Sequence, residues 1–267
     1  MPITPFPSLP RPLLFGHRGA SAKAPENTLA AFERAVAAGA DVLELDVHLS
    51  KDGVVVVHHD ALVDRTTNGR GEVRGFAFAE LRALDAGYRF ADAAGEHGFR
   101  GRGCQIPRLA DVLAAFPGRG FNIELKQAEP PMVRAVLDVL ERAGNADVVL
   151  AAADDGIMRA IEAAKPGVPL GMSSAECWRF WWQTMLGRPP REFAGRCLQV
   201  PPYHYGVLPV LSRRVVRAAH DAGLEVHVWT INDPREAAHW LSRGVDGVMS
   251  DDPDAIAHAV LSARRAA

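Results

Sequence analysis

Short apolar runs rich in β-branched residues alternate with amphipathic segments rich in Ala, Leu and Arg along this chain. Strands are expected near Leu13–Gly16, Val42–Val47, Phe121–Leu125, Val148–Ala151, Val168–Gly171, Cys197–Val200, Glu225–Trp229 and Gly247–Met249. Helices are expected between most of them, at Thr28–Ala38, Leu109–Phe116, Pro131–Ala143, Gly156–Ala164, Ser212–Ala222, Pro234–Ser242 and Pro253–Ala263. This alternation, repeated about eight times, predicts an α/β fold of the (β/α)8 TIM-barrel type. A doubly wound open sheet is the alternative.

The length of the chain suits one large domain. It has 267 residues, and 48% of them are hydrophobic, so we expect a single domain over residues 1–267. The strand–helix alternation is interrupted after the second predicted strand, where glycines and charges are frequent. We interpret residues 48–106 as a small domain inserted into the barrel at this point.

The insertion begins with the stretch "LSKDGVVVVHHD". An Asp-Gly pair between two apolar runs predicts a tight β-hairpin at Asp52 and Gly53. Such a hairpin pairs residues whose numbers sum to about 103 to 105. The sequence therefore places His59 opposite the segment from Glu44 to Asp46.

Charge and cysteine content exclude several classes of protein. The 30 basic and 32 acidic residues give a formal net charge of −2, so we expect no nucleic-acid partner. The three cysteines are scattered and match neither a disulfide framework nor a zinc site. The first residues lack a signal-peptide pattern, and no apolar run approaches the ~20 residues of a membrane span. These features predict a cytoplasmic protein.

Acidic residues stand at the ends of two predicted strands. Glu44 and Asp46 end the second strand, while Glu124 and Lys126 end the third. Residues two positions apart point to one face of a strand, and the active sites of parallel barrels lie at the carboxyl ends of their strands. Three carboxylates there suit a divalent cation, Mg²⁺ or Ca²⁺, and Mn²⁺ is also compatible. A surface charge cluster neutralised by Lys126 is the alternative.

Two histidines are expected near the same carboxylates. His17 follows the first predicted strand, and the hairpin brings back His59. The near-neutral pKa of an ordinary histidine suits a general acid or base. His48 alternates in phase with Glu44 and Asp46 and is a further candidate.

Arg18 and Lys126 add fixed positive charge to this set. A metal, two cations and two histidines suit an anionic substrate whose charge grows in the transition state. Phosphoryl transfer or phosphodiester cleavage fits this chemistry. The chain contains no Gly-rich loop ending in GK[ST], which argues against reactions of nucleoside triphosphates.

A series of motifs resembles the glycerophosphodiester phosphodiesterase family. In order, they are "GHRGAS", "PENTLAAF", "DVLELDVHLSKDGVVVVHHD", "LVDRTTNGRG", "IPRL", "NIELK", "VHVWTIND" and "GVDGVMSDDP". The resemblance runs from about Leu13 to Pro253 and implies a barrel with a small inserted domain. It also implies hydrolysis of glycerophosphodiesters, such as glycerophosphocholine or glycerophosphoethanolamine, to sn-glycerol 3-phosphate and an alcohol. Arg108 replaces a usual Thr, and "VMSD" replaces "IITD", but neither change removes a candidate site residue.

The resemblance further implies a role for each matching residue. The acid/base pair would be His17 and His59. The metal ligands would be Glu44, Asp46 and Glu124. The substrate contacts would be Arg18 and Lys126 at the phosphate and Trp229 in the pocket wall. Glu26 and Asn27 of the "PEN" motif would support the loop that carries His17, or cap the first helix.

The family motifs leave the stretch "CWRFWWQTMLG", from Cys177 to Gly187, unexplained. Its tryptophans, flanked by Arg179 and Arg188, suit transient contact with a membrane or with the acyl chain of a lysolipid. The alternative is a helix that packs its aromatic residues on the barrel or in a homodimer contact.

Three other functions stay open at this point. A lysophospholipase D or cyclising phospholipase would act on a larger lipid. A barrel lyase or aldolase would need Lys126 as a Schiff-base lysine, although the neighbouring carboxylates favour its charged form. A non-catalytic phosphate-binding module would not need both histidines.

Overall fold

A curled parallel sheet forms the centre of the protein. The computed structural model describes residues 5–129, 131–144, 147–188, 191–204 and 206–266, so both ends of the predicted domain, residues 1–4 and 267, lie outside the described residues. The parallel strands follow the spatial order β5 (Val148–Ala151), β4 (Gly120–Leu125), β2 (Val42–Leu49), β1 (Leu13–His17), β10 (Gly247–Ser250), β9 (Glu225–Val228) and β6 (Cys197–Val200). This arrangement confirms the predicted α/β class.

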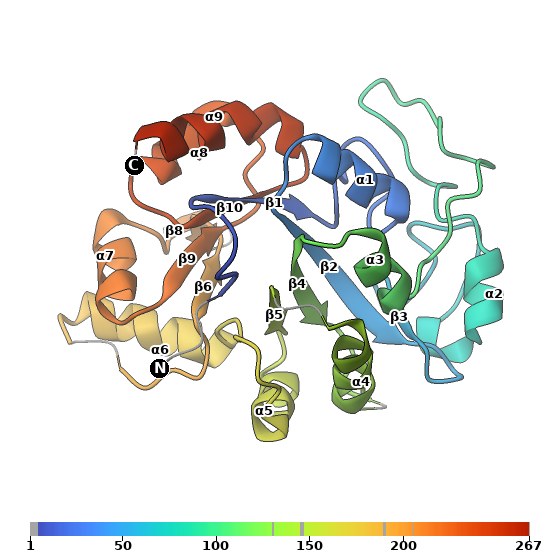
Figure 1. Cartoon of the computed structure of the whole chain (residues 1–267), viewed down its shortest axis with the longest axis horizontal. Helices are drawn as coiled ribbons and strands as arrows, with labels where there is room; N and C mark the ends of the chain where they lie inside the picture. The colour runs from blue at the N-terminus through green and yellow to red at the C-terminus, as the bar shows by residue number, and fades with distance from the viewer. Residues whose placement is uncertain (1–4, 130, 145–146, 189–190, 205, 267) are drawn as a thin grey trace.

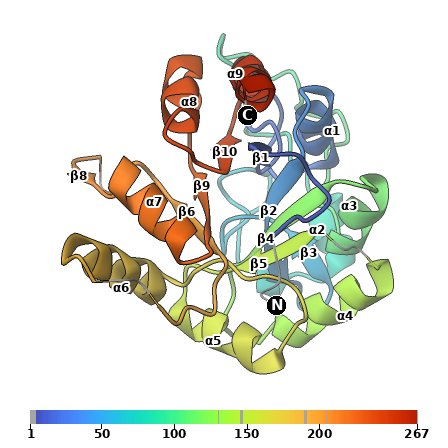
Figure 2. The same ribbon diagram turned by 60° about the vertical axis from the view of Figure 1, so that its left-hand side comes forward.

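Helices lie around the outside of the strands (Figures 1 and 2). They are α1 (Leu29–Ala37), α3 (Leu109–Ala115), α4 (Val133–Ala143), α5 (Asp155–Ala164), α6 (Ser174–Met185), α7 (Arg213–Asp221), α8 (Pro234–Leu241) and α9 (Pro253–Ala266). The helix α6 covers most of the Trp-rich stretch and begins with a capping box, in which Ser173 and Glu176 exchange hydrogen bonds. In the described part of the chain, no helix combines the length and apolar character needed to cross a bilayer.

The predicted strand at Val168–Gly171 is reduced to two isolated parallel bridges. Leu170 bridges Leu150 of β5, and Gly171 bridges Cys197 of β6. Hydrogen bonds run to both sides, from Gly171 N to Leu150 O (2.9 Å) and from Arg196 N to Leu170 O (2.7 Å). Pro169 has no N–H to donate, which limits the length of the ladder. The segment nevertheless connects the two ends of the parallel path.

Two apolar clusters hold the sheet in place. The larger one fills the space between the strands and the outer helices. The smaller one lies between strands that are far apart in the sheet order, and its members are Phe6, Leu13, Phe15, Val42, Val149, Cys197 and Met249. Phe6 is fully buried, so the N-terminal segment packs against this inner cluster.

The segment after β2 has its own small core. It contains β3 (Val55–Val57), the 3-10 helix η1 (Val73–Gly75) and α2 (Phe78–Ala83). Its buried cluster includes Val56, Val63, Val73, Leu81, Ala86 and Ile106. The predicted hairpin register is confirmed, because Val47 pairs with Val57 and His48 with Val56, so that the numbers sum to 104. The remaining strand pair, β7 (Tyr203–His204) and β8 (Leu208–Pro209), forms a separate hairpin.

Candidate active site

Strand register brings the predicted site residues together. In the β1–β2 pair, His17 is the partner of Glu44. In the β2–β4 pair, Asp46 is the partner of Glu124. His17 and Glu124 lie at the carboxyl ends of β1 and β4, the edge where the active sites of such folds are built. β2 does not end at Asp46 as expected but continues to Leu49, and the strand register places Glu44 and Asp46 at the same edge. The third carboxylate thus comes from a strand directly beside β2.

Three carboxylates form a cluster that can hold a metal ion. One oxygen each of Glu44, Asp46 and Glu124 lies within 4.8 Å of the other two. The Nζ atom of Lys126 lies 3.0 Å from Asp46 Oδ1 and 2.8 Å from Glu124 Oε1. Burial opposes the charge of this lysine, but both carboxylates raise its pKa. Lys126 therefore stays protonated, which argues against a Schiff-base role.

The pKa values of two carboxyls in the acidic cluster are shifted in opposite directions. Burial and the neighbouring charge of Asp46 raise the pKa of Glu44 to about 8. Burial also disfavours the charge of Asp46, but Lys126 and other cations outweigh it and lower the pKa of that carboxyl. Because one carboxyl has a raised pKa beside another with a lowered pKa, the site does not offer enough positive charge to keep both ionised. A cation between them would supply that charge.

His17 is held by a carboxylate from the other end of the chain. Its Nδ1 atom lies 2.6 Å from Asp251 Oδ1, and its Nε2 atom lies 4.0 Å from Glu44 Oε2. Burial of Asp251 disfavours its charge, but the hydrogen bond from His17 prevails and lowers its pKa to about 2. An ionised carboxylate only accepts hydrogen bonds, so Nδ1–H of His17 is the donor and Nε2 is left for the cavity.

His59 has a similar partner. Its Nδ1 atom lies 2.6 Å from Oδ1 of the adjacent Asp60. Arg65 donates from Nε to Asp60 Oδ2 (2.5 Å) and from both Nη atoms to Glu26 (2.6 and 2.7 Å). Glu26 also accepts from Nη1 of Arg18 (3.1 Å). This chain of ion pairs connects the segment that carries His59 to the loop that carries His17.

Asn27 joins the loop after β1 to the acidic cluster. Its Nδ2 donates to Asp46 Oδ2 (2.9 Å), and its Oδ1 accepts from the backbone N–H of Asp46 (3.3 Å). Its own N–H donates to the carbonyl of Arg18 (3.0 Å). Arg18 has a left-handed φ of 54°, and its N–H donates to Glu44 Oε2 (2.8 Å). Arg18 and Asn27 both have uncommon left-handed backbone conformations, and both are hydrogen-bonded to carboxylates of the cluster.

The two other histidines of this region have structural contacts. Nε2 of His48 lies 3.1 Å from the carbonyl of His59, so this side chain supports the backbone of the hairpin. His58 is buried, and its Nε2 lies 3.2 Å from the carbonyl of Leu62. His48 therefore lies next to the site but is engaged by the backbone, and His58 points away from it.

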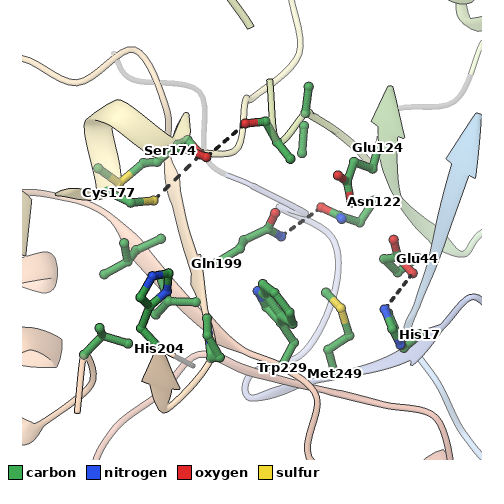
Figure 3. A pocket seen from close by; sticks show the side chains of 18 of the residues that line it. His17, Glu44, Asn122, Glu124, Ser174, Cys177, Gln199, His204, Trp229 and Met249 are labelled. Atoms are coloured by element: carbon green, nitrogen blue, oxygen red, sulfur yellow. Dashed lines mark hydrogen bonds and ion pairs between the residues drawn. The ribbon is translucent and has the colours of Figure 1, made fainter. Parts of the chain in front are cut away.

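A cavity of about 490 Å³ opens between this polar cluster and an aromatic wall. Figure 3 shows part of it, with His17 and Glu44 on the opposite side from His204. His17, Arg18, Glu44, His59, Glu124 and Lys126 line one side. Met172, Cys177, Trp178, Phe180, Trp181 and His204 line the other side. Trp229 lies between the two sides and is 38% exposed. Of the predicted site residues, Asp46 is buried beneath the lining, while Glu26 and Asn27 support it.

Sequence reasoning missed Asp60, Arg65 and Asp251. Asp60 directly follows His59, and Asp251 follows the last strand at the same edge of the sheet as His17. Asp251 carried a signal, since a carboxylate at the end of a parallel strand was already the criterion for Glu44 and Asp46. For Asp60 the signal was only its position next to His59. Arg65 lies in an irregular segment and carried no such signal.

The fold and site together define a class: an α/β enzyme with a carboxylate cluster and two carboxylate-bound histidines at the carboxyl edge of a curled parallel sheet. Comparison with known proteins identifies the family within this class. The sequence profile of the glycerophosphoryl diester phosphodiesterase family matches residues 17–255. The chain therefore belongs to the glycerophosphoryl diester phosphodiesterase family, as its motifs predicted.

Individual relatives agree with this assignment. The chain is 32% identical over 259 residues to a glycerophosphodiester phosphodiesterase of Caldanaerobacter subterraneus, covering 93% of this chain and 97% of that one. It is 28% identical to a mouse lysophospholipase D, covering 92% and 81%. The solved structure of an Oleispira antarctica phosphodiesterase in complex with the product sn-glycerol 3-phosphate has 29% identity and a TM-score of 0.77, covering 94% and 97%.

Proposed function

We propose that this protein hydrolyses glycerophosphodiesters to sn-glycerol 3-phosphate and an alcohol, with a divalent cation and two histidines at the cavity described above. The observation that carries the proposal is the pair of histidines, each bound through Nδ1 to a carboxylate and each lining the cavity beside three further carboxylates. Glycerophosphocholine and glycerophosphoethanolamine are the proposed substrates. The similarity to the Oleispira phosphodiesterase, solved with sn-glycerol 3-phosphate, supports this substrate class.

The residues present fit a divalent cation. The donor set is Glu44, Asp46 and Glu124, three carboxylates with oxygens within 4.8 Å of one another, and hard oxygen ligands suit Mg²⁺, Ca²⁺ or Mn²⁺. The raised pKa of Glu44 also indicates that a positive charge beside this carboxyl would stabilise its ionised form. When bound, the ion would neutralise charge that develops on the phosphate oxygens. Asn27 would keep Asp46 in place through its two hydrogen bonds.

The two histidines would move the protons. In the first step, the glycerol hydroxyl next to the phosphorylated carbon attacks phosphorus, and one histidine takes its proton at Nε2. The bond from phosphorus to the departing alkoxide breaks, and the other histidine protonates that oxygen. A water molecule then opens the cyclic phosphate, with the two roles exchanged. Each carboxylate partner would fix its imidazole in the tautomer that this exchange requires.

Arg18 and Lys126 would bind the phosphate. Nε of Arg18 is buried and has no hydrogen-bond partner among the described residues, although Asp46 Oδ2 lies 3.4 Å away. Lys126 has three donors, so it can keep a carboxylate contact while it donates to a phosphate oxygen. Trp229, at the centre of the cavity, would pack against the substrate.

We also infer that the chain folds as one closed (β/α)8 barrel with a small insertion. The bridges at Leu170 and Gly171 supply the eighth position between β5 and β6. The separate apolar core within residues 54–106 supports the predicted insertion at 48–106. Contacts from that segment, through His59 and Arg65, would make it part of the site.

A lysophospholipid is the second candidate substrate. The observation that favours it is the aromatic wall formed by Trp178, Phe180 and Trp181, opposite the carboxylates. Such a surface suits an acyl or alkyl chain better than a small, hydrated choline or ethanolamine group. The similarity to a mouse lysophospholipase D points in the same direction.

Product analysis tests both candidates. We expect the purified protein, supplied with Mg²⁺, Ca²⁺ or Mn²⁺, to release sn-glycerol 3-phosphate from glycerophosphocholine, and EDTA to abolish the release. Lysophosphatidylcholine should be included in parallel, with phosphorus NMR to detect cyclic phosphate. Faster turnover of the lysolipid would favour the second candidate. Failure to cleave any of these phosphodiesters with any of the metals would contradict the proposed function.

A further inference from the structure

Exposed apolar side chains gather on one edge of the protein. We define the apolar patch as Trp178, Trp182 and Leu186 of α6 and its C-cap, with Tyr203, Val207 and Leu208 of the β7–β8 hairpin. Their exposed fractions run from 36% to 80%. In both Figures 1 and 2, α6, α7 and this hairpin lie on the left-hand side of the molecule. Exposed apolar groups concentrated in this way mark an interaction surface.

The patch is continuous and does not serve the core. Trp178, Trp182 and Leu186 are four residues apart, so they form one stripe along α6. Phe180 and Thr184, on other sides of the same helix, are buried and anchor it. The ring of Trp178 meets the ring of His204 edge to face, with centroids 5.0 Å apart, which joins the helix to the hairpin. Burial of part of α6 thus explains its position, while the exposed stripe stays available for another surface.

A positively charged groove adjoins the patch. Its lining, between the end of α6 and α7, includes the five arginines Arg188, Arg191, Arg213, Arg214 and Arg217 but only two carboxylates, Glu192 and Asp221. Arg214 Nη2 donates to the carbonyl of Thr184 (2.6 Å), which ties the groove to α6. Among the described residues, the other four arginines are in no ion pair of 4.0 Å or less. Their charge is therefore available to an external anion.

We propose that the apolar patch and the arginine groove dock this protein on the surface of an anionic lipid bilayer. Tryptophan and aliphatic side chains enter the boundary between headgroups and acyl chains, while arginines contact lipid phosphates. A symmetric contact between two copies through this patch would instead bring two arginine grooves together, and their like charges would repel. Charge thus favours the lipid surface over a second copy of the chain.

Docking would place the catalytic cavity at the lipid surface. Trp178 and His204 belong both to the docking edge and to the lining of the cavity. A substrate released from the bilayer, or still partly inserted in it, would enter beside them. This inference goes beyond the proposed function, because binding to vesicles is measured without substrate.

Vesicle sedimentation tests the docking surface. Wild-type protein is mixed with vesicles of phosphatidylcholine alone or of phosphatidylcholine with phosphatidylglycerol. We expect binding to the anionic vesicles that weakens as salt is raised, because salt screens the arginine charges. Trp182→Asp should lower the partition coefficient at least about tenfold. Arg217→Glu should lower it at least about fivefold.

Matched controls separate docking from general effects. Leu261→Asp changes a side chain on α9 that is 48% exposed, and Arg235→Glu changes an exposed arginine on α8. Both controls should bind vesicles like the wild type. All four variants should cleave soluble glycerophosphocholine at the wild-type rate, which shows that they fold.

Three results would overturn the inference. The first is that the wild type fails to sediment with anionic vesicles. The second is that Trp182→Asp and Arg217→Glu bind as well as their controls. The third is that light scattering finds a wild-type dimer that Trp182→Asp converts to a monomer, since the patch would then be an interface between two copies of the chain.

Discussion

His17 and Asp251 are 234 positions apart in the sequence, yet His17 Nδ1 lies 2.6 Å from Asp251 Oδ1. Asp251 also accepts hydrogen bonds from Ser21 Oγ (2.8 Å) and Asn232 Nδ2 (3.1 Å). The carboxylate is therefore fixed by three donors from different parts of the chain. Although burial disfavours protonation of His17, this hydrogen bond and the charge of Glu44 raise its pKa. A carboxylate directly after the last strand thus raises the pKa of a histidine at the end of the first strand.

Replacing Asp251 by Asn should shift the pH profile of turnover. The neutral amide no longer stabilises the imidazolium, so the pKa of His17 falls and the limb of the profile that reports it moves to lower pH. Movement of the acid limb would identify His17 as the base, and movement of the alkaline limb would identify it as the acid. We expect turnover to fall by about ten- to a hundredfold.

The neighbouring Asp252 supplies the control for this experiment. It pairs with Lys23 at 3.0 Å and makes no hydrogen bond or ion pair with His17, so Asp252→Asn should keep the wild-type profile. Equal shifts in the two variants, or none in Asp251→Asn, would show that Asp251 does not act through His17.

Removal of either histidine should abolish most turnover and spare the fold. His17→Ala and His59→Ala each remove a proposed proton-transfer group, and such groups contribute about 10²- to 10⁴-fold to rate. Binding of the divalent cation, measured by calorimetry, should persist because neither residue belongs to the acidic cluster. His258→Ala, on α9, is the matched control. Near-normal turnover in either site variant would eliminate that histidine from the mechanism.

The acidic cluster predicts a graded response to metal. Glu44→Gln removes a proposed carboxylate ligand, so the cation concentration needed for half-maximal activity should rise at least about tenfold. Asn27→Ala frees Asp46 from two hydrogen bonds, and such supporting residues change metal affinity by about ten- to a hundredfold. Both variants should regain activity at a high concentration of the cation. A metal titration unchanged by Glu44→Gln would argue that this residue is not a ligand.

Gly19 allows the loop of His17 and Arg18 to approach α1. Its φ is 85°, and a Cβ atom added there would lie 2.6 Å from the carbonyl carbon of Ala31. Gly39 has a similar φ of 90°, but a Cβ atom added there would have no atom within 4 Å. A substitution at Gly39 therefore measures the cost of the left-handed backbone conformation without a steric clash. Gly39→Ala should reduce the free energy of unfolding by about 1 kcal/mol. Gly19→Ala should reduce it by more and should also lower turnover; equal losses in denaturant titrations would show that the close contact has no effect.

Local rules were enough to predict the centre of the site. Because side chains alternate along a strand, Glu44 and Asp46 were expected on one face, and parallel pairing brought Glu124 beside them. The Asp-Gly turn set the register of the β2–β3 hairpin, which returns His59 to the cluster. These contacts depend only on period, direction and turn length, which the sequence displays.

Other contacts depend on how distant segments meet. Asp251 reaches His17 only because β10 pairs with β1, a neighbour relationship that no local pattern reveals. At the predicted strand Val168–Gly171, Pro169 limited the ladder to isolated bridges, although the apolar run suggested a strand. The exposed stripe of α6 could not be distinguished by periodicity from a buried face. Tertiary packing decides these three features.

Arg65 should prove to be a positioning residue for His59. It binds Asp60 through Nε and Glu26 through both Nη atoms, and a lysine cannot reproduce this fork of donors. We therefore expect both Arg65→Ala and Arg65→Lys to lower kcat about tenfold while KM changes little.

Arg74→Ala is the control, because Arg74 is 51% exposed against 49% for Arg65 and makes a comparable 2.6 Å pair with Glu72, away from the site. Exposed ion pairs contribute little to stability, so a loss of turnover in Arg65 variants with an unchanged Tm would locate the effect in the position of His59. Equal kcat values in the Arg65 and Arg74 variants would show that the ion-pair chain has no part in turnover.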